Sequence, residues 1–192
     1  MKPFFTILIL FLLFKLNYCQ NIDSLDSKKS DFNKLLNNDI SSLIGKKLPS
    51  FELYKLNGEP VNSFSLLGKP AVLNFWFIHC PPCLAEMPVL NNLKNDFEKQ
   101  VNFIAFGNDS EEEIESFLKR KRFDFLHIIN AAQYAKEQLG LVSYPVTFVL
   151  DKNLVIRHIE KAPNVLENNK IKADTEFKNR ISIHLNKLVQ QQ

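Results

Sequence analysis

A run of mostly apolar and β-branched residues, Ala71–Phe77, is followed almost at once by Cys80-Pro81-Pro82-Cys83. Such a run predicts a buried strand, and proline directly after it is typical of the first positions of a helix. We therefore expect a strand that leads into a helix over residues 84–97, with Cys80 at the helix N-terminus. This junction restricts the fold, because a buried strand that feeds a helix belongs to a sheet that helices cover.

The two cysteines at this junction are a candidate redox-active dithiol. The free N–H groups and partial positive charge of a helix N-terminus stabilise a thiolate, and a Cys in such a motif has its pKa lowered from about 8.5 to roughly 3.5–7.5. We therefore expect Cys80 to be the attacking thiol. Cys83 follows about one helical turn later, where it can attack a mixed disulfide at Cys80 and release the substrate, so we expect it to be the resolving thiol.

Length and charge narrow the class of protein. The chain has 192 residues, 45% of them hydrophobic, which is enough for one core and predicts a single globular domain. The formal net charge of +3 is small and the cations are interspersed with acidic residues, so we expect no nucleic-acid partner. The exception is the basic run Lys119–Arg122, which follows an acidic stretch and is expected to end a helix and complement its dipole.

The N-terminus predicts export. Lys2 precedes an apolar run from Phe4 to Phe14, which is shorter than the ~20 residues that span a bilayer and is typical of an export signal. We expect residues 1–19 to be a signal peptide, residues 20–44 a tether or short helix, and residues 45–192 the folded domain. Lys15, directly after the run, leaves a signal anchor open as an alternative.

Cys19 lies where the signal would be cut. Leu16 stands three residues before it, as in a bacterial lipoprotein signal, although Tyr18 occupies a position where such signals usually have a small residue. Simple cleavage and a lipid anchor at Cys19 are both open, and with them membrane attachment through the N-terminus. The expected location is the periplasm or cell envelope, where disulfide chemistry persists. The remaining close cysteine pair closes too short a loop to add much stability, which favours a catalytic role.

The rest of the chain alternates predicted strands with predicted helices, which indicates a mixed sheet covered on both faces. Phe51–Tyr54 and Val61 flank Asn57-Gly58, a pattern that predicts a hairpin with a type I′ turn. Pro88 is expected to kink or interrupt the helix after the cysteines. Further strands are expected over residues 101–106, 123–129, 146–150 and 154–159, and further helices from Ser110, with Glu113 completing a capping box, over 131–139 with Gly140 at its end, and over 174–189.

These residues resemble the exported TlpA/ResA-like thiol–disulfide oxidoreductases of the thioredoxin superfamily over roughly residues 44–161. The resemblance implies an α/β thioredoxin fold, a central mixed sheet flanked by helices with an added N-terminal β-hairpin. It places the active site at the start of the helix after the first core strand. It implies no cofactor beyond the redox-active disulfide of the two cysteines. The motifs that carry it are Gly45–Phe51, Leu73–Trp76, Cys80–Cys83, Glu86–Pro88, and Val142–Pro145 followed by Thr147–Asp151.

The resemblance also assigns roles to residues around the dithiol. Pro145 is expected to be cis and to face the dithiol, so that the backbone of Tyr144 pairs with an extended substrate. Glu86 matches a carboxylate that raises thiol pKa and serves as a base for the second step, although a Glu early in a helix also serves the helix dipole. Trp76 is expected to face the core and to help shape the substrate surface. His79 stands where the family commonly has an aromatic residue, and is either a cation that favours the neighbouring thiolate or an exposed substitution.

The leading hypothesis is a thiol–disulfide oxidoreductase that exchanges disulfides in exported protein substrates through two thiolate displacements. Potentials of thioredoxin-fold proteins range from about −270 mV to about −120 mV, and the sequence does not set the value. The resemblance favours a reductant, whose substrates include apocytochrome c cysteines before haem attachment. A reductant in this location is expected to take its electrons from a membrane donor.

Other functions are alternatives to this hypothesis. Copper proteins of the same fold use two cysteines and a distant histidine, so Cys80, Cys83 and either His127 or His158 are alternative Cu(I) ligands, although such proteins usually have three residues between the cysteines. Structural zinc lacks a fourth ligand near the pair, and Leu84 stands where covalent haem attachment needs His. A peroxiredoxin-type peroxidase needs a Thr three residues before its Cys and an Arg nearby, which the sequence does not offer. A purely structural disulfide is the remaining alternative. We expect no metal.

Overall fold

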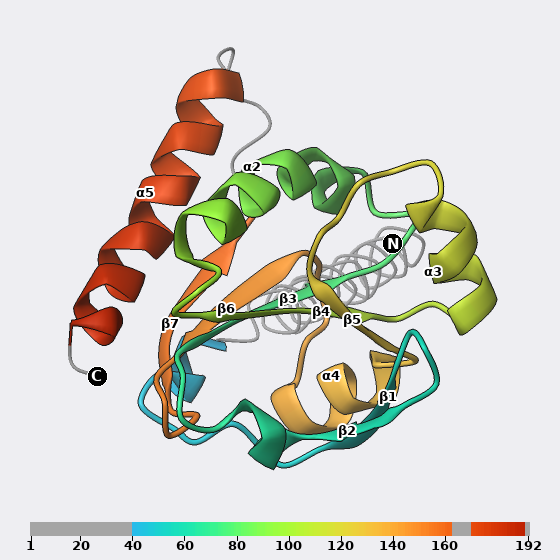
Figure 1. Cartoon of the computed structure of the whole chain (residues 1–192), viewed down its shortest axis with the longest axis horizontal. Coiled ribbons are helices and arrows are strands. Elements are labelled where there is room, and N and C mark those ends of the chain that lie inside the picture. The colour runs from blue at the N-terminus through green and yellow to red at the C-terminus, as the bar shows by residue number, and fades with distance from the viewer. Residues whose placement is uncertain (1–39, 163–169, 191–192) are drawn as a thin grey trace, which may run out of the picture. The chain divides into compact units, whose positions relative to one another are not determined.

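The computed structural model of the chain describes residues 40–162 and 170–190 (Figure 1). The expected signal peptide, Cys19 and nearly all of the expected tether lie outside the described residues. Within the described part of the chain, no helix combines the length and the apolar character that crossing a membrane requires. The described residues include a seven-stranded sheet in the order β2-β1-β5-β4-β3-β6-β7.

The middle of the sheet is the buried strand that the sequence predicted. Strand β3 (Ala71–Trp76) pairs in parallel with β4 (Asn102–Gly107) and antiparallel with β6 (Val146–Leu150), so the sheet is mixed. Beyond these, β5 (Leu126–Ile129) runs parallel to β4, and β7 (Ile156–Lys161) runs antiparallel to β6. Every residue of β3 is buried, because helices cover both faces of the sheet at this strand.

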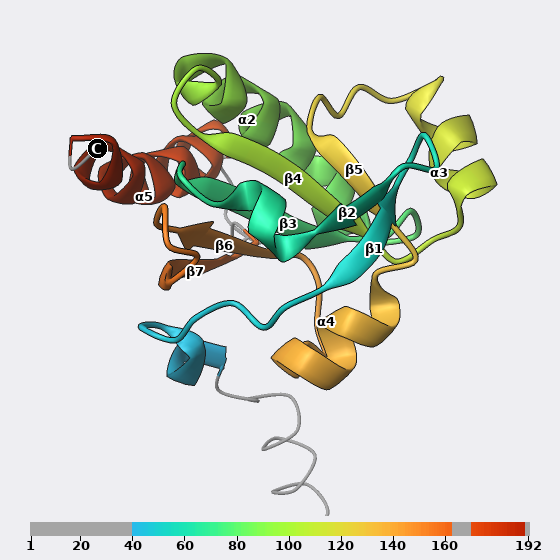
Figure 2. The same ribbon diagram turned by 60° about the horizontal axis from the view of Figure 1, so that its bottom comes forward.

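Helices lie on both faces of the sheet (Figure 2), and each face has its own core of buried side chains. Helices α2 (Pro81–Phe97), α3 (Glu111–Leu118) and α5 (Lys170–Val189) contribute to the core on the face where Val72 and Trp76 point. Helix α4 (Ala132–Leu139) and the segment that leads from the short 3-10 helix η1 (Ile40–Leu43) to Phe51 cover the other face, with Leu73 and Phe75. The alternation of side chains along β3 therefore anchors helices on both sides.

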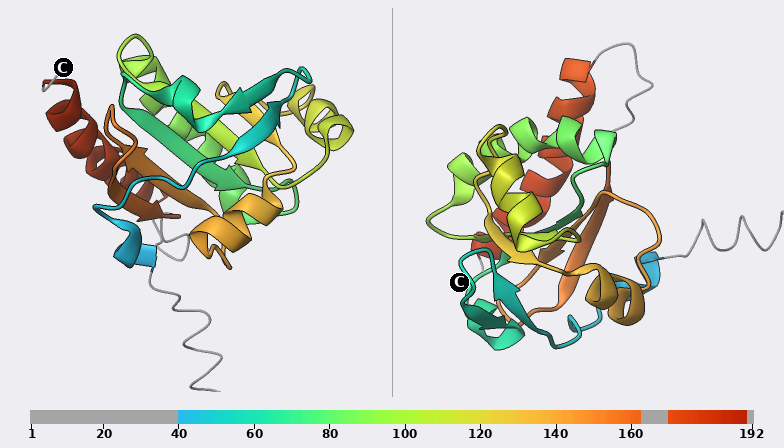
Figure 3. Two further views of the ribbon diagram at one scale, coloured as in Figure 1. Left: turned by 90° about the horizontal axis from the view of Figure 1, so that it is seen from below. Right: turned by 90° about the vertical axis from the view of Figure 1, so that its right-hand side faces the viewer.

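The expected N-terminal hairpin is present at one edge of the sheet, with α5 toward the other edge (Figure 3). Strands β1 (Glu52–Lys55) and β2 (Pro60–Asn62) are antiparallel, and the 3-10 helix η2 (Ser63–Leu66) follows them. The predicted type I′ turn is wrong. Lys55 N–H donates to Glu59 O at 2.9 Å, and only Gly58 of the loop has positive φ, at 76°. Gly58 N–H donates to Lys55 O at 2.9 Å, so Leu56 and Asn57 are the central residues of a type I turn that a left-handed glycine follows. The Asn57 side chain also accepts from Glu59 N–H at 3.2 Å.

Other local predictions had mixed outcomes. The Ser110 capping box of α3 and the left-handed Gly140 after α4 are confirmed.

The interruption expected at Pro88 is wrong, since α2 continues through it. Pro88 is exposed, while Met87 and Val89 beside it are buried and offset the lost hydrogen bond. Helix α5 begins at residue 170 rather than 174. The strand expected over 123–129 begins at residue 126, and Phe123 and Phe125 are buried in the irregular segment before it.

Candidate functional site

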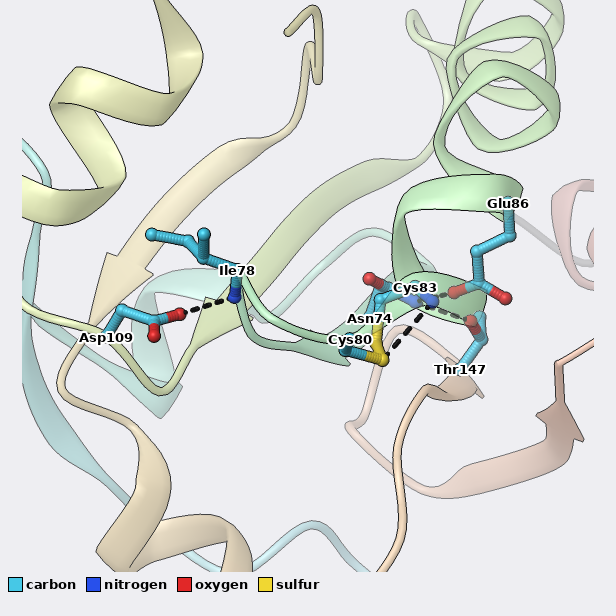
Figure 4. Close-up of a disulfide and its surroundings, with 7 residues drawn as sticks. All are labelled: Asn74, Ile78, Cys80, Cys83, Glu86, Asp109 and Thr147. Carbon is cyan, nitrogen blue, oxygen red and sulfur yellow. Dashed lines mark hydrogen bonds between the residues drawn. A yellow bond between two sulfur atoms is a disulfide. The ribbon is translucent and has the colours of Figure 1, made fainter.

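The two cysteines lie at the junction of β3 and α2, as the sequence predicted. Cys80 is the N-cap of α2 and Pro81 is the first helical residue. Cys80 and Cys83 form a disulfide, with their Cα atoms 5.2 Å apart, and Cys83 N–H lies 3.2 Å from Cys80 Sγ (Figure 4). Both residues are buried, with Cys80 3% exposed and Cys83 1% exposed. Because Pro81 and Pro82 have no N–H, Cys83 N–H is the backbone donor of the first turn that points toward the sulfur of Cys80.

An acidic residue from the next strand holds the loop before the cysteines. Asp109 follows β4, and its Oδ2 accepts from Ile78 N–H at 2.8 Å (Figure 4). The backbone adds to this contact, since Asn108 N–H donates to Trp76 O at 3.1 Å. Burial raises the pKa of Asp109, and the hydrogen bond from Ile78 partly opposes the shift. The loop that carries Cys80 is thus fastened to the end of the neighbouring parallel strand.

Glu86 lies one turn after Cys83 and is buried in a polar cluster. Asn74 Nδ2 donates to Glu86 Oε1 at 2.7 Å and to Thr147 Oγ1 at 3.0 Å, so α2, β3 and β6 meet at this point (Figure 4). Among the described residues, Glu86 Oε2 has no hydrogen-bond partner. Burial raises the pKa of Glu86 from 4.5 to about 8; the Asn74 hydrogen bond opposes this shift and the charge of Glu160 adds to it. A carboxyl with this pKa can give or take a proton near neutral pH.

This environment bears on the two roles that the sequence left open for Glu86. The carboxyl lies beyond the first turn of α2, where the helix dipole acts most strongly, and it is 1% exposed. A residue that served the dipole would be ionised and near solvent. The geometry therefore favours a role in proton transfer over a role in helix stability.

The segment around Pro145 lies at the same edge of the sheet as the cysteines. The Tyr144–Pro145 peptide bond is cis, as expected, and the pairing of Phe75 with Val146 brings this bond beside the end of β3. The Tyr144 ring packs edge to face on Phe77, with ring centroids 5.6 Å apart. Burial raises the pKa of Tyr144, and a hydrogen bond with the Asn108 side chain opposes this shift. Phe77 and Tyr144 together form an aromatic pair next to the dithiol loop.

Trp76 and His79 differ from each other in exposure. Trp76 is fully buried and packs on Phe117, so its side chain supports the core as expected but offers no surface to a substrate, contrary to the second part of the expectation. His79 is exposed and lies near two carboxyls: the pKa of Asp109, which burial raises, and the pKa of Glu113, which the Ser110 hydrogen bonds lower, each include a small lowering contribution from His79.

The described residues do not support the copper alternative. Within residues 40–162 and 170–190, no group of three or more His, Cys, Asp or Glu side chains is arranged to hold a metal ion. His127 is buried with its ring against Trp76. His158 stacks on His184 of α5 and lies 3.0 Å from Glu160 Oε2. Neither imidazole joins the cysteines in such a group, so the described residues contradict the alternative Cu(I) ligand sets.

Sequence reasoning missed Asn74, Asp109 and Thr147. Asn74 and Thr147 are polar residues inside strands whose other residues are apolar, and a buried polar side chain needs a partner. That signal could have identified both as site residues. Asp109 follows β4 just as the dithiol loop follows β3, and the carboxyl ends of neighbouring parallel strands lie at one edge of a sheet. This placement is the signal that could have identified Asp109.

Comparisons with known proteins agree with this geometry. Residues 44–159 match the AhpC/TSA family. Thioredoxin-like protein YneN from Bacillus subtilis is 29% identical over 119 residues, which are 60% of this chain and 69% of that protein. Thiol-disulfide oxidoreductase ResA from Bacillus thuringiensis is 32% identical over 112 residues, which are 57% of this chain and 65% of that protein, slightly less than two thirds of its length.

The fold has a solved counterpart in the thioredoxin domain of a thiol-disulfide oxidoreductase from Bacteroides vulgatus. The two structures have a TM-score of 0.63 and 19% sequence identity, and the match covers 74% of this chain and 98% of that one. The expected thioredoxin fold, with its mixed sheet flanked by helices, is confirmed.

Proposed function

The chain belongs to the AhpC/TSA family and, within it, to the ResA-like thiol–disulfide oxidoreductases, and on this premise we propose that it exchanges disulfides in exported protein substrates. Cys80 and Cys83 are the reacting pair, and Glu86 is the proton acceptor. One observation carries the proposal: a disulfide spans the first turn of α2, and a buried carboxyl with a pKa of about 8 lies one turn further on.

The first step is an attack by Cys80 in the reduced protein. Cys83 N–H, the first backbone donor of α2 after the two prolines, and the positive end of the helix dipole stabilise its thiolate. The thiolate attacks one sulfur of a substrate disulfide, so that a bond forms between Cys80 Sγ and that sulfur while the substrate S–S bond breaks. The second substrate sulfur leaves as a thiolate and takes a proton from solvent.

The second step releases the substrate. Cys83 gives its thiol proton to the ionised Glu86 carboxyl, whose Oε2 has no partner among the described residues, and the new thiolate attacks Cys80 Sγ. The bond between Cys80 and Cys83 forms, the mixed disulfide breaks, and the substrate sulfur leaves as a thiolate that takes a proton from solvent. Two electrons have then passed from the dithiol to the substrate, and the protein is left in the oxidised state. Phe77, Tyr144 and Pro145 offer the substrate surface at the adjoining edge of the sheet.

We take reduction as the direction in the cell, with the periplasm or cell envelope as the location. The apolar run at Phe4–Phe14 supports export, and attachment through a lipid at Cys19 is the alternative to simple cleavage. A dithiol donor in the membrane then supplies the two electrons that restore the reduced pair. Apocytochrome c cysteines before haem attachment are one substrate class that this chemistry would serve.

A redox titration tests the activity and its direction. The full chain is equilibrated in buffers of defined dithiol/disulfide ratio, and free thiols are counted by alkylation. We expect a two-electron transition at or below about −250 mV, as for a reductant, whereas a value near −120 mV indicates an oxidant. If no reversible transition is found, the dithiol proposal fails.

The order of attack is tested by substitution at each cysteine. Cys80→Ala is expected to abolish exchange, while Cys83→Ala is expected to accumulate a mixed disulfide with the substrate, because the resolving thiol is missing. The adducts are counted on non-reducing gels with a disulfide-bonded protein as substrate. Equal accumulation in the two variants contradicts the assigned order.

A further inference from the structure

The basic run Lys119–Arg122 lies beside the dithiol helix. Helix α3 ends at Leu118 and Lys119 is its C-cap, so the remaining cations of the run lie beyond the helix. The expected role of the run, to complement the helix dipole, therefore applies mainly to Lys119. All four cations are exposed. The chain then turns back to β5 alongside α2 (Figure 1).

A buried side chain of α2 holds this segment in place. Asn91 is 7% exposed; its Nδ2 donates to Arg122 O at 3.0 Å, and its Oδ1 accepts from Asp124 N–H at 2.9 Å. Phe123 and Phe125 are buried in the same core as α2. The cations next to these residues thus have a defined position against the helix that begins at the dithiol.

A groove lies between α2 and the basic segment. It has a volume of about 310 Å³. Leu84, the residue after Cys83, lies at its end nearest the disulfide. Asn91, whose side chain holds the basic segment, lies seven positions after Leu84, which at 1.5 Å per residue is ~10 Å, or about three residues of extended peptide. The apolar wall is formed by Leu84, Met87 and Pro88, and the cationic wall by Lys121 and Arg122.

Charge differs between the two sides of the dithiol. On the side before Cys80, His79 lies near Asp109 and Glu113. On the side after Cys83, the groove carries Lys121 and Arg122. Arg122 pairs with Asp124 at 2.6 Å, whereas Lys121 makes no ion pair within the described residues. An acidic segment is therefore attracted to one side and repelled from the other, which sets the direction of a bound chain.

We propose that this groove is a docking surface for the protein substrates, and that its occupant is an extended segment with acidic and apolar residues within about three residues of the reacting cysteine. The apolar wall packs on the apolar residue, and Lys121 attracts the acidic one. The inference rests on the proposed function, because the dithiol supplies the reacting atom at one end of the groove.

The test compares disulfide-bonded peptides that differ only at the two positions after the cysteine, with Glu, Gln or Lys there. The reduced full-length protein is mixed with each peptide, and kcat/KM is measured at low salt. We expect the Glu peptide to react about five-fold faster than the Gln peptide and the Lys peptide to react more slowly, with the preference lost at high salt. Lys121→Glu should remove the preference. The matched control Lys136→Glu, on the exposed surface of α4, should keep it.

The outcomes separate this inference from the proposed function. Equal rates for the three peptides overturn the docking surface and leave the exchange activity standing. A loss of preference that is equal in Lys121→Glu and Lys136→Glu also overturns it, because the effect then comes from net charge. No reaction with any peptide, while the control disulfide of a small aromatic thiol is also untouched, removes the proposed function and with it the inference.

Discussion

Replacing Glu86 with Gln should remove a large pH-dependent loss of stability from the oxidised protein. Burial raises the pKa of Glu86 from 4.5 to about 8 in the folded state, while the unfolded chain exposes the carboxyl to water. The folded state therefore holds this proton more tightly than the unfolded state does. Below pH 4.5 both states are protonated and nothing is lost, whereas stability falls as the pH rises from 4.5 through 8, where ionisation must occur in a buried site.

The size of the effect follows from the two pKa values. At about 1.36 kcal/mol per pKa unit, the difference corresponds to roughly 5 kcal/mol of unfolding free energy. Gln has nearly the shape of a protonated Glu and is neutral at every pH. Its amide oxygen can accept from Asn74 as Glu86 Oε1 does at 2.7 Å. Glu86→Gln should thus match the natural protein below pH 4.5 and exceed it in stability by up to roughly 5 kcal/mol above pH 8.

The assay is urea unfolding of both oxidised proteins, followed by circular dichroism at pH values from below 4.5 to above 8. At each pH, the free energy of unfolding of the natural protein is subtracted from that of Glu86→Gln. The contributions of all other titrating groups cancel in this difference, because both proteins contain them. Glu137→Gln makes the same charge change on the exposed surface of α4 and serves as the control. A difference that stays constant over this pH range refutes the assigned pKa and with it the proton-acceptor role of Glu86.

Two further predictions concern the loop and helix beside the site. Asp109→Ala removes the acceptor for Ile78 N–H, so it should lower the free energy of unfolding in urea by about 1 kcal/mol and slow disulfide exchange. Asp109→Asn keeps an acceptor and should restore both the stability and the exchange rate. Equal losses in the two variants contradict the hydrogen-bond argument. Ser110→Ala breaks the capping box with Glu113 and should destabilise the protein by about 1 kcal/mol without changing its redox potential, so a shifted potential contradicts a purely structural role.

Local sequence signals predicted the centre of this fold well. The apolar run, the two prolines and the capping residues each act within a few residues of one another, so β3, α2 and α3 follow from neighbours in the chain. The hairpin turn was missed for the opposite reason. The turn type depends on how β1 and β2 align. Because Tyr54 pairs with Pro60, the two central turn residues are Leu56 and Asn57 instead of the expected Asn57 and Gly58.

The candidate site also contains residues that local sequence predicts and residues that it does not. The cysteines and Glu86 belong to one continuous helix, so their spacing along the chain is also their spacing in space. Asn74 and Thr147 are 73 residues apart and meet only because β3 and β6 are neighbouring strands. Sequence patterns predict a strand's buried face but do not identify its partner strand. The polar cluster around Glu86 therefore required the three-dimensional structure.

The partners of Glu86 explain why a destabilising carboxyl suits this site. A Lys or Arg beside it would favour the ionised form and lower its pKa, leaving a weak base. Asn74 is neutral and donates a single hydrogen bond to Glu86, so desolvation dominates and the pKa of the carboxyl stays near 8. A free thiol has a pKa of about 8.5, and proton transfer between groups of similar pKa is efficient in both directions. The same burial that weakens the fold at high pH thus brings the pKa of Glu86 toward that of a free thiol, the kind of group from which it takes a proton in the proposed second step. Asn74, by remaining uncharged, leaves the pKa of Glu86 raised.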